Sequence, residues 1–522
     1  MIELVKKEIA KVVGSDIPIA VTASEKPEFG HYSTNVAFKL AGQLKKPPFE
    51  IARELGEKLK ATSDMFSKVE AMAPGFVNFW IAPEVLRAEM GGILKQKKGY
   101  GESKVKSPKS KVNLEYVSAN PTGPLTMANG RGGFYGHALA NVLESAGNKV
   151  TREYYVNDAG NQIRLLGESI LADLGIAASA ENHYKGEYIK DLAKSLKLKV
   201  KSKDAEQVGK LAAAILFKSI KASLKKAGIK HDVWFSEDAN LHKKNELAKT
   251  LEFLKKKGAT EEKDGALWLG DGVLVKSDGN PTYFLADLAY HYDKLIKRKF
   301  DFAIDIWGAD HHGYAQRMKK GVEALGVDGD KLKILITQLV RLVSGGKEVR
   351  MSKRKGEFVT MDDLIGEVGA DAARFFFLMH SLDTHMDFDL DLAKEKSNKN
   401  PVYYAQYALV RCSNILLKAK VKSPKSKTDL SLLQSDAAMN LMLELVKFPD
   451  LITQTAEDYQ VHRLTKYASD IAKALHLFYE KDRVLNAENA SLRDARLALV
   501  MAAKTVLENL FDLLGVSKPK KM

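Results

Sequence analysis

The sequence predicts an α/β protein built around a Rossmann-like, doubly wound parallel sheet. A helical insertion interrupts the sheet domain, an α+β domain precedes it and an all-α bundle follows it. Strand-like and helical segments alternate from about residue 111 onward, which is typical of a parallel sheet with helical crossovers. Between about 164 and 260 the pattern is mainly helical and rich in lysine. After about 390 only helical periodicity remains, which favours a separate bundle.

A repeated octapeptide marks two connectors. K-V-K-S-P-K-S-K occurs at 104–111 and again at 420–427. Each copy is basic, carries a central proline and lacks apolar periodicity, so each is expected to be an exposed linker. Before the first copy, helical patterns mix with strand-like stretches such as 75–81. The expected domains are 1–105, 106–390 with the insertion at about 164–260, and 391–522.

The central domain is expected to open with a strand at 112–116, where apolar side chains alternate along the chain. A helix follows from about 129 to 146 and ends at Gly147, since glycine commonly closes helices. A second strand runs from about 150 to 156. Further strands of the sheet are expected at 265–276, 302–307 and 332–340.

The chain is basic, with 81 Lys and Arg residues against 66 Asp and Glu residues and a net charge of +15. This excess suits a polyanion such as nucleic acid, although a generally basic proteome would produce the same excess.

The one cysteine, Cys412, excludes an internal disulfide and a cysteine-based metal site. It fits a reducing cytoplasm. No uninterrupted apolar stretch approaches the roughly 20 residues that a bilayer demands, so no membrane partner is expected.

The segment N-L-E-Y-V-S-A-N-P-T-G-P-L-T-M-A-N-G-R-G, at 113–132, predicts a nucleotide site. A strand ends in a loop with two prolines, and a helix begins. This arrangement places free backbone N–H groups and the positive end of a helix at the carboxyl edge of the sheet, where anions bind. A generic strand–loop–helix has the same layout, so this geometry alone does not identify the ligand.

Together with R-E-Y-Y-V-N-D-A-G-N-Q-I at 152–163, this segment resembles the arginyl-tRNA synthetases, class I enzymes whose HIGH motif lies at this turn. The resemblance covers nearly the whole chain. It implies the ATP-dependent attachment of L-arginine to its tRNA through an arginyl-adenylate. It also implies ATP as substrate with Mg²⁺ on its phosphates, no tightly bound cofactor, and action as a cytoplasmic monomer. The N-terminal domain would contact the tRNA elbow, and the C-terminal bundle would bind the anticodon.

The HIGH positions read Thr126-Met127-Ala128-Asn129, so both histidines of the motif are absent. The family's histidines are expected to donate hydrogen bonds to the ATP phosphates in the transition state. A Thr hydroxyl and an Asn amide can donate as well, but neither becomes cationic near neutral pH. By resemblance, Thr126, Ala128, Asn129 and Gly130 bind ATP, and Thr126 and Asn129 are catalytic donors. The alternative is a non-catalytic tRNA-binding paralogue, which the intact remaining motifs disfavour.

Two further loops are expected to hold ATP. The segment 350–354, R-M-S-K-R, resembles the second class I signature, KMSKS, and nearby glycines permit it to move. Its Lys353 is expected to reach the phosphates as charge grows in the transition state. W-G-A-D-H-H-G, at 307–313, follows a strand, and its adjacent side chains diverge too much for a three-ligand metal site. The expected ATP-binding residues of these loops are Gly308, Asp310, His311, Arg350, Met351, Ser352 and Lys353.

Arginine recognition requires carboxylates, because a planar guanidinium presents five donors in a fixed fork. Glu115 lies just before the nucleotide loop, and Asp287 follows Tyr283 by one helical turn. By resemblance these three residues bind arginine, and Ser118 and Asn120 lie near its α-amino and carboxylate groups. Taken alone, Glu115 would more simply be an ion-pair partner. A paired-acid pocket should reject lysine without an editing domain.

N-P-V-Y-Y-A-Q-Y, at 400–407, resembles the family's entry into the anticodon-binding bundle. By resemblance, Tyr403, Tyr404 and Tyr407 bind tRNA, since aromatic rings can stack on unpaired bases. A helical aromatic stripe is also typical of a core, so at least one of the three tyrosines is expected to be buried.

Overall fold

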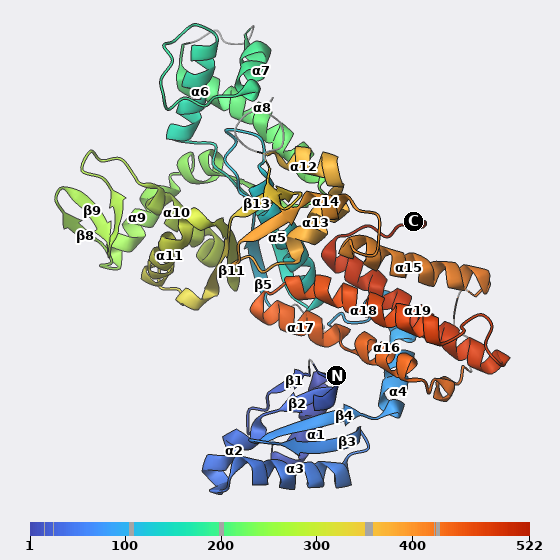
Figure 1. Ribbon diagram of the computed structural model, residues 1–522. Helices are drawn as coiled ribbons and strands as arrows, with labels where there is room; N and C mark the ends of the chain where they lie inside the picture. Colours follow the sequence, from blue (N-terminus) through green and yellow to red (C-terminus); the bar gives the residue numbers. More distant parts are fainter. Residues whose placement is uncertain are drawn as a thin grey trace.

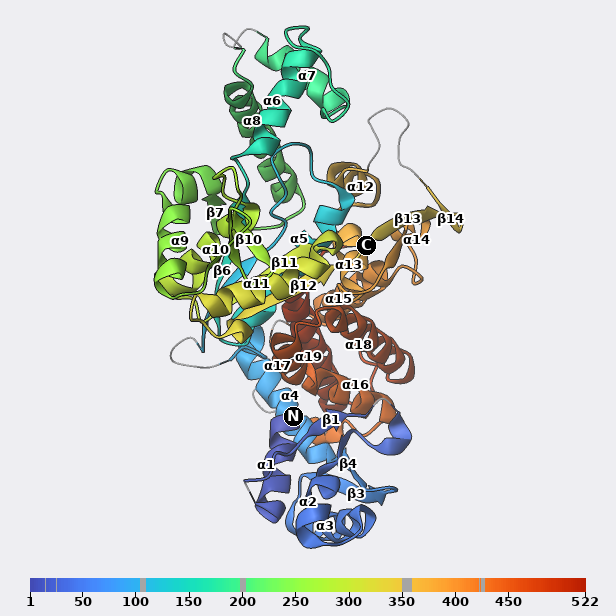
Figure 2. The same ribbon diagram turned by 90° about the vertical axis from the view of Figure 1, so that its left-hand side faces the viewer.

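The computed structural model describes residues 1–14, 16–24, 26–103, 109–197, 203–349, 359–421, 423 and 428–522. Figure 1 shows a central sheet domain with the helices α6–α8 at one end and the N-terminal domain at the other. In Figure 2 the C-terminal bundle lies between the sheet domain and the N-terminal domain. No helix in these ranges combines the length and the apolar character that a membrane span requires.

The central sheet has five parallel strands in the order β12–β11–β5–β6–β7. The strands are β5 (Lys111–Glu115), β6 (Lys149–Val156), β7 (Val233–Ser236), β11 (Phe302–Gly308) and β12 (Leu332–Thr337). The chain starts at β5, winds outward to β7 and then returns to β11 on the other side of β5. The doubly wound sheet expected from the sequence is confirmed. Its switch point lies between β5 and β11, and such sheets bind ligands there, at the carboxyl ends of the strands.

Helix α5 (Met127–Ser145) connects β5 to β6 and is buried along most of its length. A Cβ atom at Gly136 would lie 2.3 Å from Cγ of Tyr116, the residue after β5. Only glycine lets the helix approach the end of the strand this closely. The approach fixes the beginning of α5 at the carboxyl edge of the sheet, beside the switch point.

The insertion between β6 and β7 contains α6 (Asn161–Asp173), α7 (Glu187–Leu196) and α8 (Ala205–Lys226), which share a small core of their own. The structure differs from the expected helical insertion at about 164–260, because β7 lies inside that range and pairs with β6 in the main sheet. Its four residues, V-W-F-S, are too few for hydrophobic periodicity to distinguish them from the neighbouring helices. The short helical segment η3 (Asp238–His242) and α9 (Glu246–Lys256) follow.

Helices α6 and α8 cross in backbone contact at two glycines. A Cβ atom on Gly209 would lie 1.9 Å from the Ile163 carbonyl oxygen, so Gly209→Ala should force the helices apart and destabilise the insertion by roughly 1–3 kcal/mol. Amide hydrogen exchange in α6–α8 measures this loss. Gly91→Ala is the control, because a Cβ atom there meets nothing within 4 Å; it should stabilise its helix by about 0.5–1 kcal/mol. Unchanged protection in Gly209→Ala would contradict the crossing.

One of the expected strands belongs to another sheet, and a second lies mostly in the central sheet and ends in another. The range 265–276 forms the hairpin β9 (Ala266–Leu269) and β10 (Gly272–Val275), which joins β8 (Glu261–Lys263) in a separate antiparallel sheet. Gly270, at φ +56°, makes the tight turn. The range 332–340 divides between β12 and β13 (Val340–Ser344). Strand β13 pairs with β14 (Lys347–Glu348) and β15 (Met386–Asp389).

The remaining helices of the central domain surround these sheets. They are α10 (Tyr283–Tyr292), η4 (Asp293–Lys297), η5 (Ala309–His311), α11 (His312–Ala324), η6 (Gly329–Lys331), α12 (Met361–Val368), α13 (Ala370–Leu378) and α14 (Leu390–Lys394). Helix α10 and η4 run directly into β11, and α12 lies beside the beginning of α5. These two segments bring most of the side chains described below to the switch point.

The N-terminal domain has a four-stranded antiparallel sheet in the order β1–β2–β4–β3. Its elements are α1 (Ile2–Val13), β1 (Val21–Ala23), η1 (Pro27–Phe29), β2 (Tyr32–Thr34), α2 (Val36–Leu44), α3 (Pro48–Thr62), β3 (Phe66–Met72), β4 (Phe76–Ile81), α4 (Pro83–Gln96) and η2 (Lys97–Gly99). Helix α4 leaves this domain and lies against the bundle (Figure 1).

The C-terminal part is all helical, as the sequence predicts. It contains α15 (Pro401–Lys418), η7 (Leu430–Leu432), α16 (Asp436–Val446), α17 (Phe448–Asp458), α18 (His462–Lys481) and α19 (Ala490–Leu514). Its apolar side chains continue into the core of the sheet domain, so the two parts are packed together.

Arg374 of α13 joins three parts of the molecule. Its side chain is 2% exposed and donates to the carbonyl oxygens of Ala227 (2.9 Å), Gly228 (3.1 Å) and Leu514 (3.2 Å). These carbonyls lie at the carboxyl ends of α8 and α19. The negative ends of two helix dipoles therefore compensate this buried cation in place of a carboxylate.

Candidate active site at the switch point

The Thr126–Asn129 turn forms a closed helix cap. The Asn129 side-chain oxygen accepts hydrogen bonds from the backbone N–H (2.9 Å) and the hydroxyl (2.8 Å) of Thr126. The Thr126 hydroxyl oxygen in turn accepts from the Asn129 backbone N–H (3.3 Å). One of the two donors expected to face ATP, the Thr126 hydroxyl, is thus directed at the Asn129 side-chain oxygen instead. Among the described residues, the Asn129 side-chain NH₂ has no partner, so this group remains available to a ligand.

The same turn is hydrogen-bonded to the segment that follows the KMSKS-like loop. Met127 N–H donates to the Val359 carbonyl and Met361 N–H donates to the Leu125 carbonyl, both at 2.9 Å. Thr126 and Thr360 form an antiparallel bridge. Arg350, Met351, Ser352 and Lys353 lie outside the described residues. Their segment is nevertheless tied at its far end to the nucleotide turn.

The W-G-A-D-H-H-G loop lies at the carboxyl end of β11, as expected. The side chains of Asp310 and His311 are largely exposed, and His311 Nε2 lies 3.4 Å from Asp310 Oδ2. The loop therefore borders the switch point with polar, accessible groups.

Three acidic side chains lie at one level across three neighbouring strands. Asp305 of β11 and Glu153 of β6 are both in register with Glu115 at the end of β5. All three side chains are buried. Neighbouring strands are only about 4.8 Å apart, so this acid row would repel itself unless cations compensated it.

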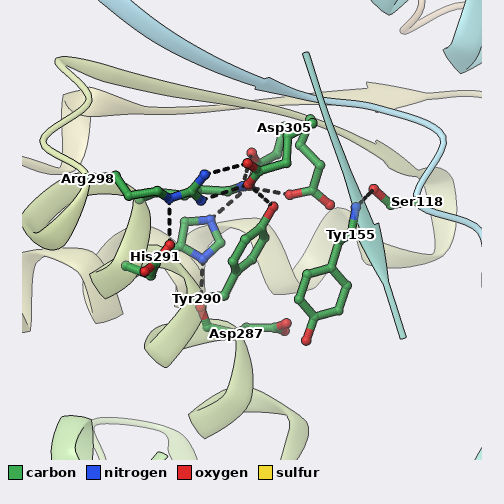
Figure 3. A network of polar contacts seen from close by, with 11 residues as sticks. Ser118, Tyr155, Asp287, Tyr290, His291, Arg298 and Asp305 are labelled. Carbon is green, nitrogen blue, oxygen red and sulfur yellow. Dashed lines mark hydrogen bonds and ion pairs between the residues drawn. The ribbon is translucent and has the colours of Figure 1, made fainter. Parts of the chain in front are cut away.

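Lys294 compensates two of these acids. Figure 3 shows His291 beside one of them, Asp305. Lys294 Nζ donates to Glu115 Oε2 (2.6 Å) and to Asp305 Oδ1 (2.8 Å), and His291 Nε2 lies 2.8 Å from Asp305 Oδ2. Although burial opposes ionisation, Lys294 and His291 hold the pKa of Asp305 down at about 2. Burial raises the pKa of Glu115, and Lys294 counteracts this effect. Glu115 is therefore an ion-pair partner inside the protein, as its interpretation in isolation predicted.

Arg298 compensates the third acid of the row. Its guanidinium forms a two-fold hydrogen bond with the Glu153 carboxylate, which also accepts from the Tyr290 hydroxyl at 2.6 Å. Arg298 lowers the pKa of Glu153 although burial opposes this. His291, Lys294 and Arg298 all come from α10, η4 and the residue after η4. In the described part of the chain, one short segment therefore supplies both cations of the acid row, Lys294 and Arg298, together with the His291 imidazole.

Asp287 lies at the start of that segment and differs from the acid row. Its Oδ2 accepts a hydrogen bond from the Tyr314 hydroxyl (2.5 Å), but in the described part of the chain it has no Lys or Arg partner. Burial raises its pKa to about 6, and the charge of Glu115 acts in the same direction. The charges of the two acids therefore act on each other, and Asp287 is the one without a Lys or Arg partner among the described residues. Tyr283, one turn earlier, is 58% exposed.

The other residues expected to bind arginine also lie at the end of β5. The Ser118 hydroxyl accepts from the Tyr155 backbone N–H (3.0 Å) and is a hydrogen-bond partner of Glu115. Asn120 donates to the Gln162 side chain (2.6 Å). Val117 and Ser118 have φ values of +70° and +39°. Such strain is rare for a β-branched residue and concentrates at functional sites.

Sequence reasoning did not identify Glu237, a third carboxylate near the pocket. This buried residue follows β7, and its carboxylate accepts from the Asn157 amide (3.0 Å) and faces His242 Nε2 (3.0 Å). Its charge contributes to the raised pKa values of Asp287 and Tyr283. It was missed because β7 was not recognised. His291 and Lys294 could have been found from their helical spacing after Asp287.

A second polar and aromatic cluster lies on the bundle. Tyr403 and Tyr407 stack at 6.4 Å between ring centroids, and the Arg411 guanidinium lies 4.8 Å from the Tyr407 ring and 4.9 Å from that of Tyr479. The expectation that one of the three tyrosines is buried is wrong. All three are half-buried, and Tyr404 only borders the core. Arg411 and Tyr479 are additions that the sequence pattern did not reveal.

Three family models match successive parts of the chain. They are the arginyl tRNA synthetase N terminal domain at 1–81, the tRNA synthetases class I (R) catalytic domain at 89–380 and the DALR anticodon binding domain at 405–522. The arginine–tRNA ligase of Carboxydothermus hydrogenoformans is 44% identical over 95% of this chain and 94% of its own length. That of Listeria monocytogenes is 42% identical over 100% of this chain and 98% of its own length.

Two solved structures of arginyl-tRNA synthetases also match this chain. An arginyl-tRNA synthetase structure from Campylobacter jejuni matches with a TM-score of 0.77 and 33% identity, covering 85% of this chain and 100% of that one. The arginyl-tRNA synthetase of Thermus thermophilus has the same fold, with a TM-score of 0.81, 21% identity and full coverage of both chains. Together with the class I catalytic model, which spans more than half of the sequence, these matches establish that the chain belongs to the arginyl-tRNA synthetase family.

Proposed function

We propose that this chain ligates L-arginine to its tRNA through an arginyl-adenylate. In the first step an arginine carboxylate oxygen attacks the α-phosphorus of ATP, and pyrophosphate leaves. In the second step a hydroxyl of the tRNA's terminal ribose attacks the activated carbonyl, and AMP leaves. The main support is that two features occur together at the switch point. One is Asp287, a carboxylate without a Lys or Arg partner, and the other is the Thr126–Asn129 turn. The lost histidines alone do not favour a non-catalytic paralogue.

The nucleotide would lie over the beginning of α5. Backbone N–H groups and the positive end of this helix favour its phosphates, and the Asn129 NH₂ supplies a neutral side-chain donor. Mg²⁺ would arrive on the phosphates as part of the nucleotide substrate, which needs no dedicated cage of protein ligands. Ala128 is exposed at this turn and Gly130 is buried. These positions fit close packing against the nucleotide.

The arginine side chain would reach Asp287 and the accessible edge of Glu115. A guanidinium can bridge two separate acceptors in its plane, whereas an ammonium is a single compact donor. Tyr283 and Glu237 border the same pocket. Ser118 and Asn120 lie on the side toward the nucleotide turn, which suits contacts with the amino acid's α-groups.

The bundle cluster would contact the anticodon, with Tyr403, Tyr407 and Tyr479 offering ring faces and Arg411 a cation. Base stacking on such rings is worth about 1–3 kcal/mol per base. On the N-terminal domain, the exposed Phe38 and Phe76 lie 5.4 Å apart between ring centroids. This pair is a second platform for an unpaired base and fits contact with the tRNA elbow.

Lys353→Ala should lower the rate of adenylate formation about 10²-fold while changing the arginine Kd little. A mobile cation that reaches the phosphates only in the transition state contributes to the rate and not to ground-state binding. Lys353 comes six residues before Val359 in the sequence, and Val359 is bonded to the nucleotide turn. Single-turnover kinetics measures the effect. A rate equal to that of the unmodified chain would remove Lys353 from the mechanism.

The function itself is tested by charging assays. Arginine-dependent exchange between pyrophosphate and ATP, measured with and without tRNA, reports the first step, and attachment of labelled arginine to tRNA reports the second. A screen over all amino acids should give charging with arginine alone. Tight tRNA binding without charging by any amino acid would overturn the proposal in favour of the non-catalytic paralogue.

A further inference from the structure

Lys294 is fully enclosed, with 0% of its side chain exposed. Its ammonium touches Glu115 and Asp305, and it lies 4.0 Å from the centroid of the Tyr290 ring. A substrate cannot reach it. Any part that Lys294 plays in the reaction must therefore be exerted through the two carboxylates that it contacts.

Lys294 separates two acids that the sheet register forces together. Glu115 and Asp305 are directly opposite on β5 and β11, and an ionised carboxylate is not stable in such surroundings without a partner. His291 also assists Asp305, since its two ring nitrogens face Asp305 Oδ2 (2.8 Å) and the Asp287 carbonyl oxygen (2.7 Å). Glu115 has no other lysine, arginine or histidine partner among the residues that the structure describes. Its ionisation depends on Lys294 more than that of Asp305 does.

We propose that Lys294 is a positioning residue of the arginine site, which keeps the Glu115 carboxylate ionised and fixed beside Asp287. This inference rests on the proposed function. Lys294 occupies Oε2 of Glu115, and Ser118 is its other partner. With Glu115 held in this way, an incoming guanidinium meets two carboxylates in a fixed relation, which is the condition for bidentate recognition.

Removing the ammonium should make arginine binding depend on pH. The charged or titratable groups around Glu115 and Asp287 would then be Asp305, His291, Tyr155, Tyr290, Glu153, Glu237 and Tyr314. Burial and the charge of Asp305 both raise the pKa of Glu115. Without Lys294 nothing would counteract this rise as strongly, so the carboxyl would bind a proton more readily and would ionise again as the pH rises.

The test is calorimetric titration of L-arginine into the full chain at pH 7 and pH 9. Lys294→Met should raise the Kd on the order of 30-fold at pH 7, and the loss should shrink severalfold at pH 9. The ratio of variant to unmodified Kd cancels the titration of arginine itself. Lys297→Met is the matched control, because this neighbouring lysine pairs with Glu246 and not with the acid row. It should bind arginine normally at both pH values.

A double variant guards against misfolding. Lys294→Met with Asp305→Asn removes one buried charge of each sign, which is less costly than leaving an unpaired one. It should fold, and it should show a smaller pH-dependent loss of arginine affinity, because the charge of Asp305 no longer raises the pKa of Glu115. Lys294→Met with Glu115→Gln should bind no worse than Glu115→Gln alone. A normal Kd in the folded Lys294 variants, or a loss equal at both pH values, would overturn the role of Lys294. Failure of the unmodified chain to bind or charge arginine would instead overturn the proposed function.

Discussion

Asp287→Asn should raise the Kd for L-arginine on the order of 10³-fold, about 4 kcal/mol. Asn keeps the shape of the side chain and can still accept the Tyr314 hydrogen bond, so the loss reports the charge. Asp287 matters most among the acids of the site because Lys294 already compensates Glu115. Equilibrium arginine binding measures the effect, with the exposed Asp330→Asn as control. A change below about tenfold would show that another group holds the guanidinium.

Protonation of the Asp287 carboxylate should weaken arginine binding at low pH. Burial raises the pKa of Asp287 to about 6, with Glu115 and Glu237 adding to the shift while Tyr314 and His291 oppose it. Below that pH the side chain takes up a proton and loses its attraction for a cation. The arginine Kd should therefore be flat above about pH 7 and rise by up to tenfold per pH unit below 6. In Asp287→Asn this rise of the arginine Kd below pH 6 should disappear.

Arg374→Met should destabilise the protein by roughly 3–5 kcal/mol. The change removes hydrogen bonds to the carbonyls of Ala227, Gly228 and Leu514 and leaves these buried acceptors unpaired. Because these acceptors end α8 and α19, the insertion and the bundle should both loosen from the sheet domain.

Denaturant unfolding and amide exchange at the ends of α8 and α19 would measure this loss. Arg164→Met is the control, since Arg164 is 58% exposed in a helical i,i+4 pair with Glu168 worth about 0.3–0.5 kcal/mol. An effect of Arg374→Met no larger than that of Arg164→Met would show that water replaces the guanidinium at these carbonyls.

The sequence predicts those helices and strands that are long enough to show a clear hydrophobic period. Strand β5, helix α5 and strand β6 are long enough for their hydrophobic patterns to be distinct, and the nucleotide loop between β5 and α5 follows from its prolines and glycines. The strand β7 is too short to show a hydrophobic period. The β9–β10 hairpin resembles one strand until Gly270 is recognised as its turn. Local pattern does not specify which sheet a short strand joins.

The sequence named acids, a nucleotide turn and a lysine loop whose roles stay predictions, and it did not reveal the charge balance around Glu115 and Asp287. Glu115 and Asp287 are both acids at expected positions, yet one is paired inside the protein and the other is not. That difference arises from the register of β5 with β11 and from the path of η4, which are long-range features. The bonds between Thr126 and Asn129 are instead local, and a Thr three residues before an Asn at the start of a helix is a pattern from which this cap could have been found. The role of Lys353 stays a prediction, because its segment lies outside the described residues.

The closed cap at the start of α5 bears on how this variant motif can change over evolution. Its two side chains hold each other, and the bridge from Thr126 to Thr360 ties the start of α12 to the same turn. Replacing either position alone with the histidine of the HIGH motif would break the cap before any imidazole could assist the phosphates. Each single replacement should therefore be deleterious, and only a joint change of both positions would avoid leaving half of a broken cap.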